Sequence, residues 1–195
     1  MASVILDAPR RGFTLIELLV VASIIALIAG ISTAAFNNYS RTQRLTQSIK
    51  NLGLAVRDAQ NRALSSVGGL NWGVHIVPGT NTLELFSTPS VAYTDPAVAR
   101  FTRDISSGVE FFDPLGQLPA GFNVNALFVL PHGAVGFLND DGSTCIGGSD
   151  DFDCSPDLGI DCVIIGVRLQ GTSQARYLKV NGRSIFEDDD GTSCP

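Results

Sequence analysis

The sequence predicts an α+β fold, in which one long N-terminal helix packs against a mainly antiparallel, β-rich head. Three observations predict it. The run Leu18–Phe36 carries no charged side chain, which is typical of a membrane-spanning helix. Apolar residues then recur every three or four positions as far as Val67, which indicates an amphipathic helix. After Gly69 the pattern changes to short strands separated by turn residues.

Glu17 is the unusual residue of the N-terminal helix. The uncharged run that follows it would extend about 28 Å at ~1.5 Å per residue, close to the thickness of a bilayer core. A carboxylate in such a helix costs on the order of 2.5–3.5 kcal/mol at the bilayer centre and less near the interface. Ionisable residues in this position are usually paired or functional, so Glu17 is the first candidate functional residue.

Around Glu17 the chain reads Arg11-Gly12-Phe13-Thr14-Leu15-Ile16-Glu17-Leu18. This motif resembles the processing site of type IV pilins and of type II secretion pseudopilins. In that family a prepilin peptidase cuts after the glycine and methylates the new N-terminal amine. The resemblance implies cleavage between Gly12 and Phe13 and methylation of Phe13. It also implies that Glu17 serves assembly, by offering its carboxylate to the ammonium of Phe13 in a neighbouring subunit.

The sequence then divides into four segments. Residues 1–12 form the leader, and residues 13–36 form the membrane and assembly helix. Residues 37–67 continue this helix in amphipathic form, and residues 68–195 form the head, with an acidic, cysteine-containing C-terminal region. Arg10 and Arg11 favour a cytoplasmic leader, so we expect a single-pass inner-membrane protein with an exported head, which assembly places in a periplasmic or extracellular filament.

The amphipathic helix should bury one stripe and end at Gly68-Gly69, because glycine is common just after a helix. Gly30, Ser32 and Gly53 are poor helix formers that either permit local bending or ease close packing. The expected stripe consists of Leu45, Ile49, Leu52, Val56, Ala59, Ala63 and Val67.

The head should contain one mainly antiparallel sheet or two small sheets. Pro78-Gly79-Thr80-Asn81 predicts a first hairpin, and Asn181-Gly182 predicts a two-residue type I′ hairpin near the C-terminus. The turns at 113–116 and 131–133, and the stretch 55–63, resemble the H-type minor pseudopilins. The expected strands are Trp72–Val77, Thr82–Thr88, Val109–Phe112, Val124–Leu130, Ala134–Leu138, Cys162–Leu169, Ala175–Val180 and Arg183–Phe186.

Charge is distributed unevenly along the chain. Residues 41–62 carry a net charge of +4, whereas the chain from Ala63 onward carries −10. An acidic head argues against nucleic-acid binding, which needs a basic surface.

The resemblance to this family implies other partners: the prepilin peptidase, other pilin or pseudopilin subunits, and an inner-membrane platform with its ATPase. The sequence does not decide whether the filament is a pilus or a secretion pseudopilus, or whether the subunit is a major or a minor one.

Two other interpretations of the N-terminus compete with a filament subunit. Arg10, Arg11 and the small residues 32–34 also suit a removable signal peptide, and an uncleaved signal anchor is a third possibility. In both cases the head would be a monomeric exported binding domain. Two features argue against a signal peptide: the apolar run is longer than the apolar region of such a peptide, and Glu17 is out of place in that region.

We expect no enzyme, since His75 and His132 lie near no catalytic motif and Trp72 is best explained as a packing residue.

The four cysteines all lie in the C-terminal region, which should be exported. An even number in an exported domain predicts two disulfides, which non-reducing mass spectrometry would refute by finding four free thiols. We expect Cys145 to pair with Cys154 and Cys162 with Cys194. A four-cysteine zinc site is disfavoured because no C-x-x-C spacing is present.

Seven aspartates lie between Asn139 and Asp161. A solvated, disulfide-linked loop accounts for them without any cofactor. Calcium is the alternative, because it takes six to eight oxygen ligands. A calcium site predicts a melting temperature that rises with added Ca²⁺ and falls with a chelator, and a melting temperature that does not respond would exclude it. The candidate ligands are Asp140, Asp141, Asp150, Asp151 and Asp153.

Overall fold

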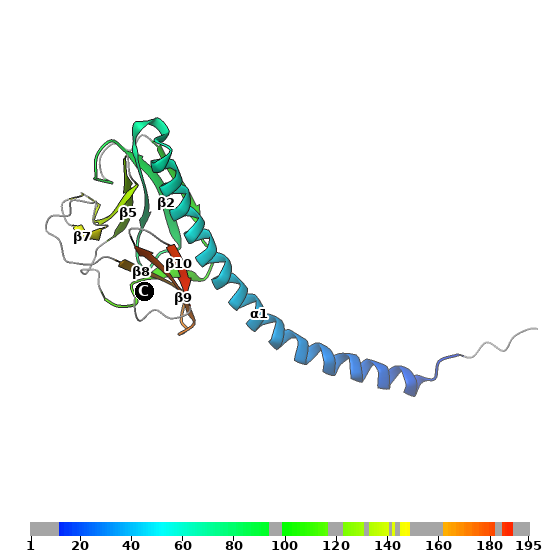
Figure 1. Ribbon diagram of the computed structural model, residues 1–195. Coiled ribbons are helices and arrows are strands. Elements are labelled where there is room, and N and C mark those ends of the chain that lie inside the picture. Colours follow the sequence, from blue (N-terminus) through cyan, green and yellow to red (C-terminus); the bar gives the residue numbers. More distant parts are fainter. Residues whose placement is uncertain are drawn as a thin grey trace, which may run out of the picture. The chain divides into compact units, whose positions relative to one another are not determined.

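The computed structural model describes residues 12–93, 99–116, 123–130, 133–140, 142, 145–148, 162–181 and 185–188. The chain forms two compact units, one up to Ser40 and one from Arg41 onward. Helix α1, Leu15–Leu64, contributes to both units, and all strands belong to the second (Figure 1). The amphipathic half of the helix therefore belongs to the same unit as the strands.

The buried stripe of α1 is confirmed except at its last position. Its residues from Leu45 to Ala63 are each at most 3% exposed, whereas Val67 is 43% exposed. Val67 was wrongly included because α1 ends at Leu64, and a 3₁₀ turn, η1 (Val67–Gly69), follows. Gly68 and Gly69 have φ angles of 71° and 67°, which glycine adopts without strain, but they lie in this turn. The helix has ended before them, and Ser66, with φ of 50°, is the first residue after it in the left-handed conformation, so the expected stop at Gly68-Gly69 was placed too late.

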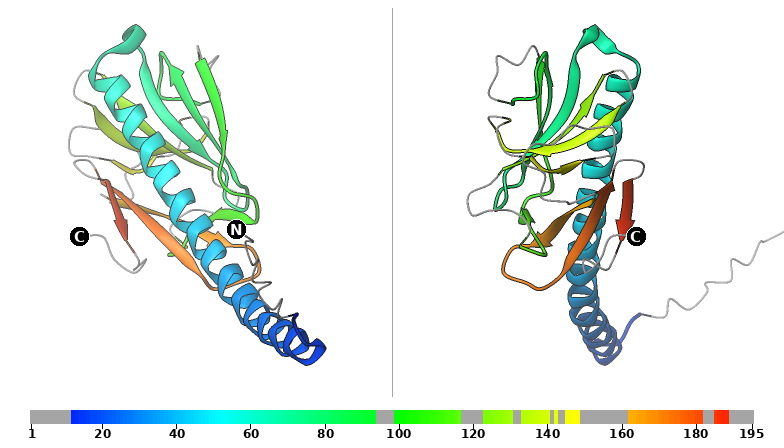
Figure 2. Two further views of the ribbon diagram at one scale, coloured as in Figure 1. Left: turned by 90° about the vertical axis from the view of Figure 1, so that its right-hand side faces the viewer. Right: turned by 60° about the vertical axis from the view of Figure 1, so that its left-hand side comes forward.

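The strands form two antiparallel sheets, the second of the two arrangements expected. The six-stranded sheet has the order β3-β2-β1-β5-β6-β7, and the four-stranded sheet has the order β10-β9-β8-β4. Figure 2 shows both sheets along the helix. The strands are β1 (Asn71–Ile76), β2 (Thr82–Thr88), β3 (Ala99–Asp104), β4 (Val109–Phe112), β5 (Val124–Val129), β6 (Ala134–Leu138), β7 (Cys145–Gly148), β8 (Cys162–Leu169), β9 (Ala175–Asn181) and β10 (Ile185–Asp188).

Two strands were missed and one hairpin was wrong. β3 and β7 are edge strands, and β7 lies inside the acidic stretch that we expected to be a loop. β9 and β10 do pair, but Val180 lies opposite Ile185, so no two-residue turn at Asn181-Gly182 joins them. This register sets two β-branched apolar residues opposite each other, where the expected register would have set Arg183 opposite Val180.

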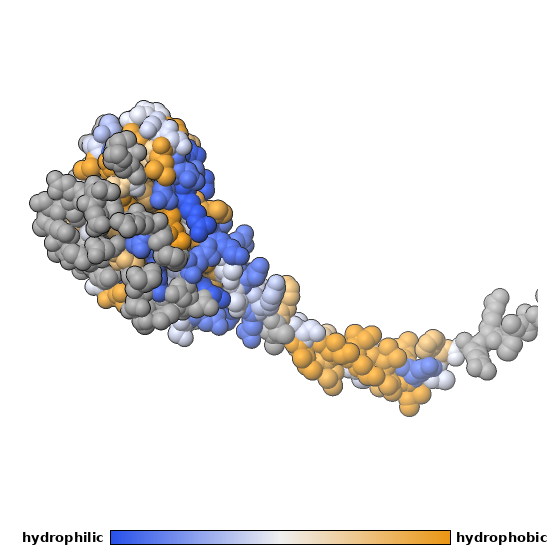
Figure 3. Space-filling view, in the orientation of Figure 1, coloured by the Kyte–Doolittle hydropathy of each residue, from blue (hydrophilic) through white to orange (hydrophobic). Residues whose placement is uncertain are grey.

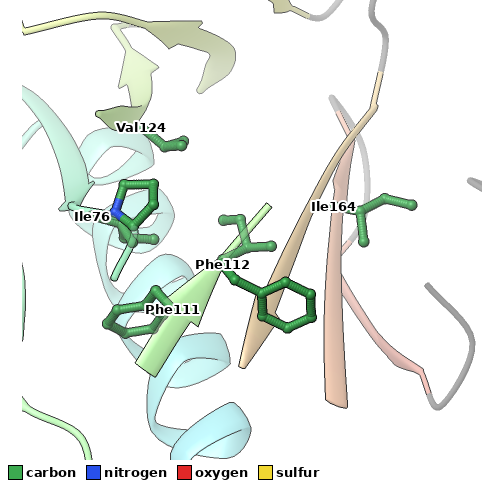
Figure 4. A pocket seen from close by; sticks show the side chains of 7 residues that line it. Ile76, Phe111, Phe112, Val124 and Ile164 are labelled. Atoms are coloured by element: carbon green, nitrogen blue, oxygen red, sulfur yellow. The ribbon is translucent and has the colours of Figure 1, made fainter. Parts of the chain in front are cut away.

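The main core lies between α1 and the two sheets. Figure 4 shows a small pocket where the sheets meet, lined by Ile76 and Val124 on one side and by Phe111, Phe112 and Ile164 on the other. Pro78 and Ile165 complete the lining, so every side chain in it is apolar. A ligand site normally adds polar groups that orient the ligand. We therefore interpret this pocket as a seam between the sheets.

A second, smaller core covers the other face of the six-stranded sheet. Strand residues alternate between faces, so Trp72, Val74 and Ile76 join the main core while Gly73 and His75 face the opposite way. The ring of Phe86 lies against Gly73, so close that an added Cβ would stand 2.8 Å from it. The small core comprises Phe86, Leu127, Leu138 and Cys145, with Tyr93 and Val129 packed against it.

Beside this small core, His75 belongs to a buried polar network. Its Nδ1 lies 2.9 Å from Oδ1 of Asn125 and 3.3 Å from Oδ1 of Asp140. The imidazole stacks on the ring of Tyr93 with centroids 3.9 Å apart, and the Tyr93 hydroxyl donates to Glu84. Arg100 donates to the Tyr93 carbonyl oxygen and lies over its ring. His75 thus has a structural role that ties the segment ending at Tyr93 to the sheet.

This network predicts a change in stability at alkaline pH. Burial, and then the hydrogen bond to Glu84, raise the pKa of Tyr93 from 10.0 to about 12. A raised pKa in the folded protein means that the unfolded chain loses this proton first. The stabilisation that the protonated Tyr93 hydroxyl gives the folded protein is therefore complete below pH 10, and it is lost as the pH rises towards 12.

We expect Tyr93→Phe to lower the free energy of unfolding at pH 8 by about 1 kcal/mol, the value of one hydrogen bond. The difference between the wild type and the variant should then shrink as the pH rises above 10. Urea unfolding of the full chain in detergent, at several pH values, measures both quantities. Tyr177→Phe is the control. A difference between wild type and Tyr93→Phe that is the same at every pH would contradict this account.

Candidate assembly site

The N-terminus of α1 is capped by a residue that we did not single out. Gly12, Phe13 and Thr14 precede the helix, and the Glu17 N–H donates to Oγ1 of Thr14 at 3.3 Å. The Leu18 N–H donates to the Thr14 carbonyl oxygen at 3.2 Å. Thr14 is therefore the N-cap, and Glu17 stands three residues later, the spacing of a capping box. This Thr-x-x-Glu signal is visible in the sequence and would have placed the helix start correctly.

Glu17 lies in the first turn of α1, where the helix dipole favours a negative charge. Its side chain is exposed, and no described residue forms an ion pair with it. The described part of the chain therefore leaves the Glu17 carboxylate without a cation. A cation for it has to come from elsewhere when this end of the helix is buried in an apolar environment.

The helix after Glu17 is apolar on all sides. Every side chain described between Leu18 and Phe36 is exposed; Leu27, for example, is 67% exposed and Phe36 69%. Figure 3 shows this segment as a continuous apolar surface. By length and composition α1 contains one stretch able to cross a membrane. Such a surface is stable only in lipid or against other apolar helices.

The basic residues of the second half of α1 have different surroundings. The Arg62 guanidinium lies 4.7 Å from the ring centroid of Trp72 and 5.7 Å from that of Phe101, and its Nε is 2.8 Å from Asp58. Trp72 is 5% exposed and donates to the Val67 carbonyl oxygen, so its expected packing role is confirmed. Together these contacts tie the edge strand β3 to α1.

Of the calcium candidates, only Asp140 lies among the described residues. Its Oδ2 accepts from Asn123 at 2.7 Å and its Oδ1 accepts from Asn125 at 3.0 Å. A cation would compete with both amide donors and with His75, so Asp140 fits a hydrogen-bonding role better than a metal site. The described residues contain no group of three or more metal-binding side chains. Asp141, Asp150, Asp151 and Asp153 lie outside the described residues, and calcium binding by them stays a prediction.

The two cysteines that the structure describes, Cys145 and Cys162, are both disulfide-bonded. Cys145 begins β7 and Cys162 begins β8, and both are buried. Cys154 and Cys194 lie outside the described residues, as does His132. The pairing of Cys145 with Cys154 and of Cys162 with Cys194 therefore stays a prediction.

Comparison with known proteins supports the importance of the N-terminus. Residues 8–33 match the family described as the prokaryotic N-terminal methylation motif. The chain is 37% identical over 86 residues to prepilin peptidase-dependent protein D of Escherichia coli K12. This alignment covers 43% of the chain and 58% of that relative, so the chain spans little more than half of the relative's length. No solved structure matches.

The matched motif contains Gly12, Phe13 and Glu17, the residues for which we expected cleavage, methylation and assembly. It coincides with the capped start of α1 and with most of its exposed apolar part. The long helix followed by antiparallel sheets is also the architecture that the resemblance implied. The chain therefore carries the N-terminal methylation motif of prepilin-like proteins, and in this motif, in its similarity to this relative and in its architecture it resembles the type IV pilins and pseudopilins.

Proposed function

We propose that this protein is a structural subunit of a type IV pilus or of a type II secretion pseudopilus, without catalytic activity of its own. The observation that supports this most is the combination found at one helix end. A matched methylation motif, a carboxylate with no cation among the described residues and an apolar helix with exposed side chains occur together there. An anchor alone would need the apolar helix but not the acid at its start.

The proposed assembly step follows from the electrostatics of that end. Cleavage after Gly12 would leave the ammonium of Phe13 directly before the Thr14 cap. In an apolar surrounding, this ammonium and the Glu17 carboxylate are each costly alone and are stabilised as a charge-assisted pair. The Glu17 of a newly added subunit would therefore pair with the Phe13 ammonium of its neighbour. The apolar faces of the two helices would pack against each other around that pair.

The proposed partners follow from this role. A prepilin peptidase would process the chain in the inner membrane, and the head would be exported. Other pilin or pseudopilin subunits would form the filament, driven by a membrane platform and its ATPase. An H-type minor pseudopilin is the subclass that the sequence resembles. A monomeric exported domain with a signal peptide or anchor is the competing function, and the state of the N-terminus separates the two.

Mass spectrometry of the protein purified from its native membrane should find a chain that begins at Phe13 with a methylated amine. A chain that begins near Ala35 would identify an ordinary signal peptide, and one that retains Met1 would identify an anchor. Gly12→Leu is the matched test, because it alters only the residue before the cut. We expect this variant to keep its leader.

Glu17→Ala and Glu17→Gln should both be cleaved normally and should both reduce incorporation into filaments at least about tenfold, since each leaves a buried ammonium unpaired. Glutamine is the informative change, because its side-chain oxygen can still accept a hydrogen bond at the N-terminus of the helix, so it loses only the charge. Filament yield is measured on sheared or secreted fractions, with Thr14→Ala as the variant that weakens the cap and keeps the acid. Normal incorporation of Glu17→Gln would show that Glu17 acts as a cap and not as a charge partner.

A further inference from the structure

Arg41 and Arg44 are two exposed bases for which the proposed filament contact at Glu17 gives no role. They stand three residues apart in α1, so they are neighbours on its surface. No described residue forms an ion pair with either of them. They belong to the polar segment 37–44 of α1, here called the neck, which joins the apolar run to the buried stripe that begins at Leu45.

The neck is long enough to pass through a lipid headgroup layer. Along the helix, Arg41 lies roughly 7.5 Å and Arg44 roughly 12 Å beyond Phe36, at ~1.5 Å per residue. The polar layer on each side of a bilayer is about 5–8 Å thick. Side chains on a helix lean towards its N-terminus, so both arginines lean back towards the apolar run. Tyr39, 65% exposed, stands at the depth where tyrosine is enriched in membrane proteins.

The charge pattern makes these bases informative. With the head exported, Arg41, Arg44 and Lys50 closely follow the apolar run on the exported side, whereas Arg10 and Arg11 precede it on the cytoplasmic side. The positive-inside tendency does not account for bases on the exported side. The chain from Ala63 onward carries −10, which an anionic membrane surface would repel. The bases in the neck lie, along the chain, between the apolar run and this acidic part.

We propose that Arg41 and Arg44 bind the phosphate groups of anionic phospholipids on the exported face of the membrane. The guanidinium group matches phosphate oxygens with two parallel hydrogen bonds, and Tyr39 would lie among the headgroups beside it. This proposal rests on the proposed function in one respect, namely that the subunit waits in the membrane with its head exported. It extends that function by naming a lipid as a partner of the unassembled subunit.

Lys50 and Arg57 provide a control with the same charge. They lie one turn to either side of Gly53, and an added Cβ at Gly53 would stand 3.4 Å from Oε1 of Glu187 in β10. Arg57 also reaches the carbonyl oxygen of Ile185, with its Nη2 at 3.5 Å. Arg57 thus contacts β10 of its own chain, and Lys50 lies one helical turn before the glycine that faces this strand.

The test is native mass spectrometry of the full processed chain, released from detergent micelles that contain equal amounts of phosphatidylglycerol and phosphatidylcholine. We expect the wild type to retain phosphatidylglycerol preferentially. Arg41→Gln/Arg44→Gln should weaken this preference by about fivefold for each arginine, the usual effect of one base near an anionic surface. Lys50→Gln/Arg57→Gln, which removes the same charge, should keep it.

A wild type without lipid preference would overturn the proposal, as would equal losses in the two double variants. If Arg41→Gln/Arg44→Gln keeps the lipid preference but forms fewer filaments, the neck contacts the acidic head of a neighbouring subunit, and the lipid proposal is wrong. The lipid measurement needs no filament. Failure of the Glu17 pairing would therefore leave its result unaffected and interpretable.

Discussion

The structure depends on a single constraint: α1 continues without interruption through two stretches whose side chains have opposite needs. From Leu18 to Phe36 the helix is apolar on all sides, and nothing in the described chain covers it. From Leu45 to Ala63 it has one apolar face, which two antiparallel sheets bury. The first stretch has to find its surroundings outside the chain. The second is satisfied by folding, so one helix connects a self-sufficient head to an apolar segment that requires lipid or other helices.

The acid at the start of this helix has two physical roles at once. In the isolated chain, Glu17 lies in the first turn with its N–H bonded to Thr14, where both the cap and the helix dipole favour it. Neither contact supplies a full positive charge. A stable helix end and the need for an outside cation are therefore compatible: Thr14 caps the helix, and the Glu17 carboxylate is left for a contact outside the chain.

Much of this fold could be predicted because its signals are local. The three-and-four spacing of the buried stripe, the glycines after Leu64 and most strand positions are visible in neighbouring residues. Val67 was assigned wrongly because its spacing continues a helix that has already ended. β3 and β7 were missed because an edge strand need not be apolar, and these two carry charges or glycines where buried strands carry β-branched residues. The contact of His75 with Asn125, Asp140 and Tyr93 joins residues from distant parts of the chain, so no sequence pattern could indicate it. The N-terminal site was predictable for the opposite reason, since all its residues lie within a single helical start.

The positions of Cys145 and Cys162 have a consequence for how this head can vary. Each is buried at the first residue of a strand, and these two strands, β7 and β8, lie in contact. Both cysteines are also disulfide-bonded, so each of these strands is fastened at its first residue by a covalent bond as well as by the core. A change at either cysteine should therefore loosen the start of its strand first, and different exchanges at these two positions would alter this part of the head while leaving the buried stripe of α1 untouched.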